Sequence, residues 1–302
     1  MACDDRQTGG DPDLASLFAT GFDLTAPPEQ RVPFVFASPH SGHVYPSSFL
    51  AASRLSALGL RRSEDAFVDK LFAEAAGLGA PIIAARFPRA FLDVNRAPGE
   101  LDQAMFEDAL SIAVDPPGTR VNAGLGVIPR IVRDGAEIYR RKLRARDAEE
   151  RLVHLHRPYH AALAKLLEET AARFGTAVLI DCHSMPSAAA IPDIVLGDRY
   201  GMAAGFALVR HAERTFERHG FTVARNIPYA GGYSTHIHGR PMLGRHALQI
   251  EVNRALYLEE DRIEPNNRFD DVGRRIGEVL RDLVAIEPAL LRSTGQRSMA
   301  AE

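Results

Sequence analysis

Two histidines follow apolar stretches that are typical of buried strands. His40 stands in "SPHSG", after "PFVFAS" at 33–38, and His183 stands in "DCHS", at the end of "AVLIDC" at 177–182. A single histidine of this kind is more often a turn residue. A catalytic zinc, however, takes three protein ligands from His, Asp and Glu and keeps one position open for water. The pair of histidines therefore predicts a metal site that needs a third ligand.

Three side chains are candidates for that third ligand. His43 comes three residues after His40, and Glu64 and Asp65 begin the next predicted helix, from which they could fold back over the first strand's end. We favour Asp65, because Glu64 would then stabilise the positive end of the helix. His43 and Glu64 stay open as alternatives. The expected set is His40, Asp65 and His183, holding Zn²⁺ or another divalent metal.

A carboxylate stands inside the apolar stretch "ALQIEV" at 247–252. Burying Glu251 there is unfavourable unless the side chain is paired or has a chemical function. An ion pair with Arg254 or Arg245 is the structural alternative to a catalytic role. Both interpretations are compatible with this position in the sequence.

Strand and helix patterns alternate along the chain around these residues. Continuous apolar stretches, typical of strands covered on both faces, occupy 33–38, 81–87, 177–182, 193–197, 221–226 and 247–252. Helical periodicity occupies 63–77, 146–175 (where Pro158 should kink or split the helix), 201–220 and 270–286. This alternation predicts an α/β fold, a three-layer α/β/α arrangement with a mixed, mostly parallel sheet. Ligands bind beyond the carboxyl ends of strands in such sheets, where the two histidines stand.

Composition excludes several classes of protein. The 302 residues are 46% hydrophobic with a formal net charge of -3, so no basic surface for nucleic acid is expected. No apolar run reaches about 18 residues, and the acidic N-terminus lacks signal-peptide features. Two cysteines make no disulfide framework, so a cytoplasmic location is expected. The absence of linkers and repeats predicts one domain at 13–290, with flexible tails at 1–12 and 291–302; the oligomeric state is left open.

Several longer stretches together resemble the N-formylglutamate amidohydrolase family. They are "PHSG" (39–42), "FPRAFLDVNRAPGELD" (87–102), "GLGVIPR" (124–130), "RPYH" (157–160), "LIDCHSMPS" (179–187), "DIVLGDRYG" (193–201), "NIPYAGGY" (226–233) and "HALQIEVNRALY" (246–257). More distantly the chain is similar to zinc carboxypeptidases and aspartoacylases, which implies a zinc-carboxypeptidase-like fold. Those relatives carry a His-x-x-Glu pair of metal ligands. In this sequence His40 matches the histidine of that pair, but His43 stands where the pair has its glutamate.

The resemblance implies an activity and roles for further residues. The expected reaction is hydrolysis of N-formyl-L-glutamate to formate and L-glutamate, as in histidine degradation, with Glu251 as the general base. Asn95 and Arg96 are expected to bind one substrate carboxylate, and Arg130 or Arg240 the other. One alternative is a hydrolase that acts on another N-acyl or N-carbamoyl amino acid. A second alternative is a protein that binds acidic metabolites without catalysing a reaction.

Other polar residues near these motifs are expected to have ordinary structural roles. In "HLHRPYH", His154, His156 and His160 lack the His-Glu-x-x-His pattern, and a proline interrupts the helix, so we predict structural roles for them. Asp181 lies two residues before His183 and therefore on the same side of the strand. It could orient that histidine or serve as an ordinary hydrogen-bonding residue.

Overall fold

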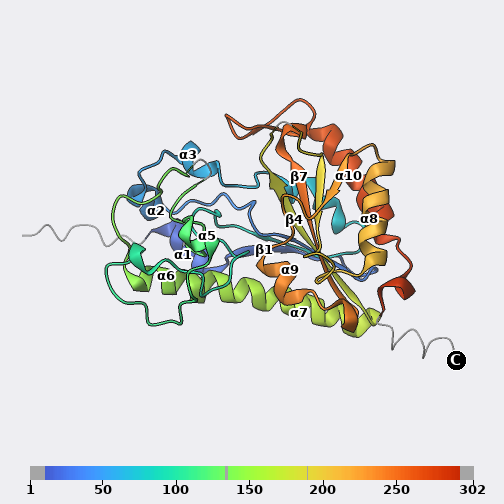
Figure 1. Ribbon diagram of the computed structural model, residues 1–302, viewed down its shortest axis with the longest axis horizontal. Helices are drawn as coiled ribbons and strands as arrows, with labels where there is room; N and C mark the ends of the chain where they lie inside the picture. Colours follow the sequence, from blue (N-terminus) through green and yellow to red (C-terminus); the bar gives the residue numbers. More distant parts are fainter. Residues whose placement is uncertain (1–10, 133–134, 189, 293–302) are drawn as a thin grey trace, which may run out of the picture.

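One mixed sheet organises the molecule (Figure 1). The computed structural model describes residues 11–132, 135–188 and 190–292. Among them, seven strands pair in the order β1-β3-β2-β4-β7-β5-β6. The neighbours β3-β2, β2-β4, β4-β7 and β5-β6 are parallel, whereas β1-β3 and β7-β5 are antiparallel. The predicted α/β fold with a mixed, mostly parallel sheet is confirmed.

The strands of this sheet are β1 (Phe22–Thr25), β2 (Phe34–Ser38), β3 (Ile82–Ala85), β4 (Ala177–Met185), β5 (Ile194–Gly197), β6 (Val223–Arg225) and β7 (Arg245–Asn253). Each of the six stretches expected to be strands overlaps one of them, and β4 and β7 extend beyond the stretches expected for them. β1 was not predicted, because it is only four residues long and three of the four are exposed, which leaves no apolar pattern to detect. A separate pair joins β8 (Leu258–Glu259) to β9 (Glu264–Pro265).

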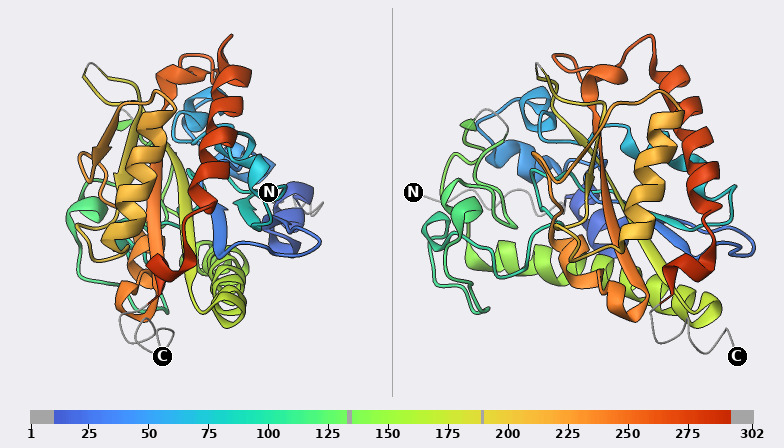
Figure 2. Two further views of the ribbon diagram at one scale, coloured as in Figure 1. Left: turned by 90° about the vertical axis from the view of Figure 1, so that its right-hand side faces the viewer. Right: turned by 45° about the vertical axis from the view of Figure 1, so that its right-hand side comes forward.

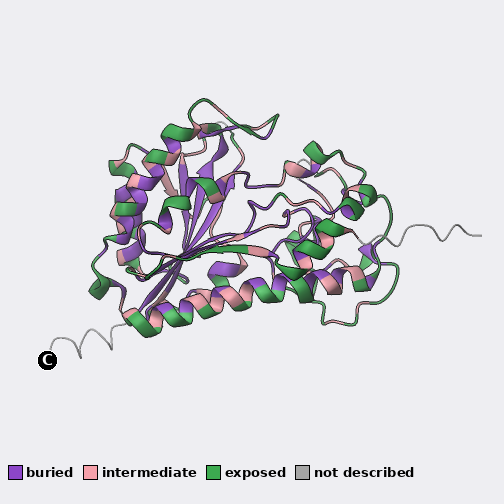
Figure 3. Ribbon diagram, turned by 180° about the vertical axis from the view of Figure 1, so that it is seen from behind, coloured by how far each residue is buried: buried purple, intermediate pink, exposed green. Residues whose placement is uncertain are grey.

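Helices cover both faces of the sheet (Figure 2). On one face lie α8 (Phe206–Arg218) and α10 (Phe269–Val284), and on the other lies α7 (Arg157–Phe174). β2 shows how this works: Phe34 and Phe36 belong to the core under α8 and α10, whereas Val35 and Ala37 belong to the core under α7. Alternate residues of a strand point to opposite faces, so a strand between two layers is apolar throughout. Figure 3 shows this buried centre.

The shorter helices are α1 (Pro12–Ala19), α2 (Ser47–Ala52), α3 (Ala57–Arg61), α4 (Val68–Leu71), α5 (Thr119–Asn122), α6 (Ala145–Arg151) and α9 (Tyr233–His238), with 3₁₀ turns at Ala73–Ala75, Gln103–Met105, Pro241–Leu243, Arg254–Leu256 and Pro288–Leu291. Most of α1, α2, α3, α5 and α6 gather beyond one end of the sheet, on the left of Figure 1. No helix in the described part of the chain has the length and hydrophobicity that a membrane crossing requires.

The continuous helix expected over 63–77 is wrong. The first residue of that stretch, Ser63, could cap a helix, but its hydroxyl instead donates to the preceding carbonyl oxygen of Leu60 at 3.0 Å. Phe67 has a φ of 63°, a left-handed conformation that interrupts a helix. The backbone N–H of Asp65 donates to the carbonyl oxygen of His40 at 3.0 Å. The segment is therefore held as a turn against the end of β2, and helix resumes only at α4.

Pro158 splits the helix expected over 146–175, as predicted. α6 ends at Arg151, a π-helical turn follows over Leu152–His156, and α7 begins at Arg157 with the proline in its first turn. A proline has no N–H to donate and its ring crowds the carbonyl four residues earlier. The π-helical turn is wider than an α-helical one and accommodates both effects, so that α6 and α7 continue as one long helical segment below the sheet in Figure 1.

The two predicted tails lie mostly outside the described residues, which leave out 1–10 and 293–302. Within their described parts, the Asp11 side chain accepts from the backbone N–H groups of Asp13 and Leu14 and caps α1. At the other end, Leu291 is fully buried.

Candidate active site

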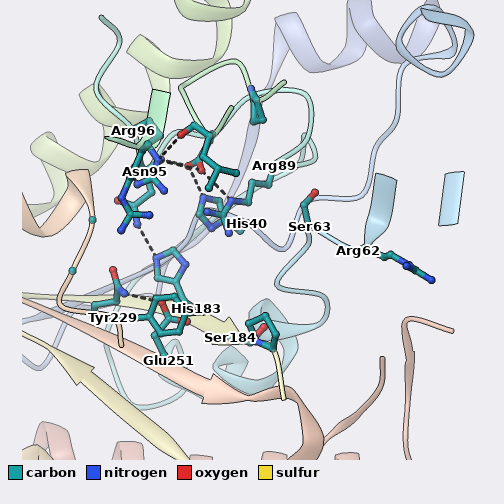
Figure 4. Close-up of a pocket in the computed structure, with 18 of the residues that line it drawn as sticks. His40, Arg62, Ser63, Arg89, Asn95, Arg96, His183, Ser184, Tyr229 and Glu251 are labelled. Atoms are coloured by element: carbon teal, nitrogen blue, oxygen red, sulfur yellow. Dashed lines mark hydrogen bonds and ion pairs between the residues drawn. The ribbon is translucent and has the colours of Figure 1, made fainter. Parts of the chain in front are cut away.

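The carboxyl ends of three neighbouring parallel strands meet at the site (Figure 4). β2 ends two residues before His40, and β4 carries His183. In the pairing of β4 with β7, His183 stands directly opposite Glu251. Because β2, β4 and β7 are parallel neighbours, their ends lie at one edge of the sheet, and all three side chains line one cavity.

Asp65 joins the two histidines in a buried cluster. Its Oδ2 lies 3.2 Å from Nδ1 of His40 and 2.9 Å from Nδ1 of His183. All three residues are at least 97% buried. One ligand atom from each lies within 4.8 Å of the others. Two imidazole nitrogens and one carboxylate oxygen are a donor set that suits a catalytic zinc.

The opposite ring nitrogen of each histidine faces a carboxylate. Nε2 of His40 lies 2.7 Å from Oδ1 of Asp93, and Nε2 of His183 lies 3.1 Å from Oδ2 of Asp181. A carboxylate that accepts from Nε2–H leaves Nδ1 unprotonated and able to bind a metal. Both histidines are thus oriented with Nδ1 towards Asp65.

Arg254 holds the third member of the cluster. Its Nη2 donates to Oδ1 of Asp65 at 2.9 Å, and its Nε donates to the hydroxyl of Ser184 at 3.1 Å. The guanidinium therefore occupies one oxygen of Asp65 and leaves the other facing the histidines. It does not form an ion pair with Glu251, which was the structural alternative for that carboxylate. Arg245 instead donates to the carbonyl oxygen of Leu167.

The electrostatics of the cluster favour a cation. Burial alone would raise the pKa of Asp65, but hydrogen bonds from His183 and His40 hold it well below its ordinary value. Burial alone would lower the pKa of His183, but Asp181 and Asp65 raise it well above its ordinary value. Without a metal, a proton on that histidine supplies the positive charge that the carboxylates attract. The residues present therefore fit a divalent metal.

Glu251 faces the same cavity with a strongly perturbed carboxyl group. Burial, opposed by the charge of His183 and reinforced by that of Asp65, raises its pKa to about 7. Gln249, two residues earlier on β7, donates from Nε2 to its Oε1 at 2.7 Å. A carboxylate with a pKa near neutrality can both accept and return a proton, as a general base and acid must.

Asn95 and Arg96 line the cavity, but their groups are largely engaged within the protein. Nδ2 of Asn95 lies 3.2 Å from Oδ2 of Asp181, and its Oδ1 accepts from the backbone N–H of Ser234 at 2.8 Å. Gly232 allows this contact, because a Cβ there would lie 2.4 Å from Nδ2 of Asn95. Nε of Arg96 donates to the carbonyl oxygen of Leu125 at 3.0 Å.

The structure does not bring Arg130 and Arg240 into this cavity, which corrects the expectation for the second carboxylate. Arg130 lies 3.5 Å from Asp102 and borders a different cavity. Arg240 donates from Nη1 to the carbonyl oxygens of His236 and Gly239. Arg130 thus lies near the carboxylates of Asp102 and Glu137, and Arg240 is held by backbone carbonyl groups of its own segment. The spacing of these residues in the sequence did not indicate either contact.

Four other arginines line the cavity, namely Arg62, Arg89, Arg120 and Arg254. Arg89 donates from Nε to Oδ2 of Asp93 at 3.0 Å and so supports the carboxylate behind His40. Figure 4 shows it near His40 and across the cavity from Glu251. It stands in "FPRAF", and only the family motif could have singled it out among the arginines.

Neither alternative third ligand reaches the cluster. His43 is exposed, with Nδ1 3.5 Å from the carbonyl oxygen of Ser41. Glu64 is buried but accepts from the hydroxyl of Tyr45 at 2.6 Å and from Nε of Arg61 at 3.2 Å. It also does not start a helix, so the predicted role at a helix end is wrong.

Two histidines of "HLHRPYH" support the loop that carries Asn95. Nε2 of His156 lies 2.9 Å from the carbonyl oxygen of Arg96, and Nε2 of His160 lies 2.7 Å from that of Val94. Burial lowers the pKa of His156 and lowers that of His160 to about 3. Both rings are therefore neutral donors, in the structural roles predicted for them.

The cavity suits a small, negatively charged ligand. Its volume is about 250 Å³, below the roughly 300–1,000 Å³ of pockets for drug-sized molecules. Guanidinium groups on its wall match carboxylates, while His40, His183 and Glu251 lie together at one part of it (Figure 4). This arrangement can hold an acidic molecule with one bond next to a metal and a proton acceptor.

Comparison with known proteins agrees with the site. The family model described as N-formylglutamate amidohydrolase matches residues 32–258. The N-formylglutamate deformylase of Pseudomonas aeruginosa is 29% identical over 264 residues, 84% of this chain and 92% of that protein. The protein of the same name from Pseudomonas putida is 27% identical, with 84% and 91% covered. The crystal structure of N-formylglutamate amidohydrolase from Ralstonia eutropha JMP134 matches with a TM-score of 0.82 and 35% identity, over 87% of this chain and 97% of that one. The chain belongs to the N-formylglutamate amidohydrolase family.

Proposed function

We propose that this protein hydrolyses the formamide bond of N-formyl-L-glutamate, giving formate and L-glutamate, with the help of a divalent metal. The observation that carries the proposal is the buried cluster of His40, Asp65 and His183 beside Glu251 in a cavity walled by arginines. The names of the two curated relatives, N-formylglutamate deformylase, support the choice of substrate.

The metal would be held by Nδ1 of His40, Oδ2 of Asp65 and Nδ1 of His183, and zinc is our first choice for this donor set. When bound, it would supply a Lewis acid for the formyl oxygen and make water easier to deprotonate. Asp93 and Asp181 keep the two Nδ1 atoms unprotonated by accepting from Nε2–H.

Glu251 is the proposed general base and acid. Its carboxylate takes a proton from the attacking water, and the carboxyl group then donates that proton to the nitrogen of the departing glutamate. A pKa of about 7 in the metal-free protein keeps both protonation states accessible near neutral pH. The hydrogen bond from Gln249 to Oε1 restricts the rotation of the side chain.

Cations on the cavity wall are proposed to bind the two carboxylates of the substrate. Arg96 is our candidate for the one next to the scissile bond, because its Nε lies 3.9 Å from Oδ2 of Asp93, the carboxylate that contacts His40. Asn95 itself is proposed to hold this loop against β4. Arg130 and Arg240 do not belong to this proposed carboxylate site, since both lie outside the cavity.

The test measures metal content and formate release together. Purified protein should contain about one divalent metal per chain, lose it to a chelator and release formate from N-formyl-L-glutamate only when metal is restored. Release of formate at the full rate after complete metal removal would refute the metal proposal alone. Metal binding with faster turnover of an N-acetyl or N-carbamoyl glutamate would refute the substrate alone.

We also propose a place in histidine degradation, which rests on the resemblance to the family. A strain that lacks the protein should accumulate N-formylglutamate when histidine is its nitrogen source. Unchanged growth and no accumulation would contradict this role without affecting the enzymatic proposal.

A further inference from the structure

The arginines of the cavity differ in what already occupies them. Arg254 pairs with Asp65, and Arg89 pairs with Asp93. Arg96 is 93% buried and donates to two backbone carbonyl oxygens. These groups have internal partners that compensate their charge or fill their donor positions.

Arg120 differs from these three. It lies on α5, its side chain borders the cavity, and that side chain makes no hydrogen bond or ion pair with any residue that the structure describes. Its positive charge repels that of Arg96 and attracts the carboxylate of Glu100. Besides burial, the positive charges of Arg89 and Arg120 lower the pKa of Arg96. An anion between Arg96 and Arg120 would relieve part of this repulsion.

The geometry of the substrate decides which carboxylate reaches Arg120. In N-formylglutamate the main-chain carboxylate is attached to the carbon that bears the scissile nitrogen, whereas the side-chain carboxylate lies two methylene groups further away. Nε of Arg96 lies 3.9 Å from Oδ2 of Asp93, whose Oδ1 contacts Nε2 of His40, so Arg96 stands on the side of the metal cluster. Arg120 is exposed, and the backbone N–H of Leu125, an apolar residue of the same cavity wall, donates to its carbonyl oxygen at 2.8 Å.

We propose that Arg120 is the specificity-determining residue for the side-chain carboxylate of the substrate, with Leu125 next to the methylene groups. This inference rests on the proposed function, because it assigns a group of that substrate to a residue of that cavity. A guanidinium whose donors have no hydrogen-bond or ion-pair partner among the described residues can give its paired donors to a carboxylate without breaking such a contact. The protein should therefore prefer N-formylglutamate over its side-chain amide, N-formylglutamine.

The test compares formate release from three substrates: N-formyl-L-glutamate, N-formyl-L-glutamine and the main-chain amide N-formyl-L-isoglutamine. The variants are Arg120→Gln, Arg120→Lys and, as a matched loss of one exposed positive charge, Arg146→Gln on α6. In Arg120→Gln the ratio of kcat/KM for glutamate over glutamine should fall about tenfold or more, as expected for loss of a charge-assisted hydrogen bond. The loss should appear mainly in KM, Arg120→Lys should recover part of the ratio, and Arg146→Gln should keep it.

Formate release from N-formylglutamate by the unmodified protein supports the proposed function. If that release is seen, two results would still overturn the inference about Arg120. One is an unchanged ratio of glutamate over glutamine in Arg120→Gln. The other is a collapse of the ratio of glutamate over isoglutamine instead, which would assign Arg120 to the main-chain carboxylate. If the unmodified protein released no formate from any substrate, the proposed function would fail. Calorimetric binding of L-glutamate against L-glutamine to both forms would then test Arg120 by itself, and equal preferences would overturn it.

Discussion

Replacing Glu251 with Gln should remove activity and at the same time stabilise the metal-free protein. Glutamine has the same shape and can still accept the hydrogen bond from Gln249, but it cannot take a proton from water. We expect formate release to fall by roughly 10²- to 10⁴-fold, the range found for the loss of general acid–base catalysis. The stability gain arises because the folded protein raises the pKa of Glu251 from 4.5 to about 7.

The sign and size of that gain follow from proton binding. Below pH 4.5 the carboxyl group is protonated in both the folded and the unfolded chain, so it contributes no difference. Between pH 4.5 and about 7 the unfolded chain loses this proton while the folded chain keeps it, so the stability of the unmodified protein falls as pH rises. A pKa difference of about 2.5, at 1.36 kcal/mol for each pH unit, corresponds to about 3 kcal/mol. Glu251→Gln does not titrate and avoids this loss.

Urea unfolding in the presence of a chelator, at several pH values between 4.5 and 8.5, measures the effect. The free energy of unfolding of Glu251→Gln minus that of the unmodified protein should rise with pH and level off near 3 kcal/mol above about pH 7. Glu259→Gln, which removes an exposed carboxylate on β8, is the control for the change in net charge. Added Zn²⁺ should narrow the difference, because a nearby dication stabilises the ionised carboxylate. A difference that stays constant with pH would refute our account of Glu251 as a buried, perturbed carboxyl group.

Further variants probe the rest of the site. Arg254→Met should weaken metal binding by about 10- to 100-fold, because the contact that orients Asp65 is lost. Competition with a fluorescent chelator measures the affinity for the metal, and an unchanged affinity would show that Arg254 does not position Asp65. Asp93→Asn should likewise weaken metal binding, since Nε2 of His40 loses its carboxylate; the same titration decides, with unaltered binding as the contrary result. Arg130→Gln should leave KM for N-formylglutamate within about twofold of its original value, because Arg130 faces a different cavity. A rise in KM of tenfold or more would show that Arg130 contacts the substrate after all.

Local sequence was enough for the scaffold of the site. β2, β4 and β7 grow out of mostly apolar stretches of the sequence, because helices cover both faces of the sheet and nearly every residue of these strands is buried. A carboxylate in such a stretch stands out, so Glu251 could be found without any partner being known. The histidines at the strand ends could be found for the same reason, since parallel strands bring their carboxyl ends to one edge.

Tertiary structure decided which side chains turn towards one another at that edge. Arg130 and Arg240 had suitable charges, but Arg130 lies against the carboxylate of Asp102 and Arg240 donates to the backbone of its own segment, both outside the cavity. Such contacts follow no sequence period. Arg120 stands in a segment without any motif, and only the fold places it at the cavity. Asp65 reaches the histidines because a left-handed residue, Phe67, interrupts the helix that periodicity predicts. Local patterns of apolar residues indicate which strands are buried, whereas the pairing of charged side chains depends on where distant segments of the chain meet.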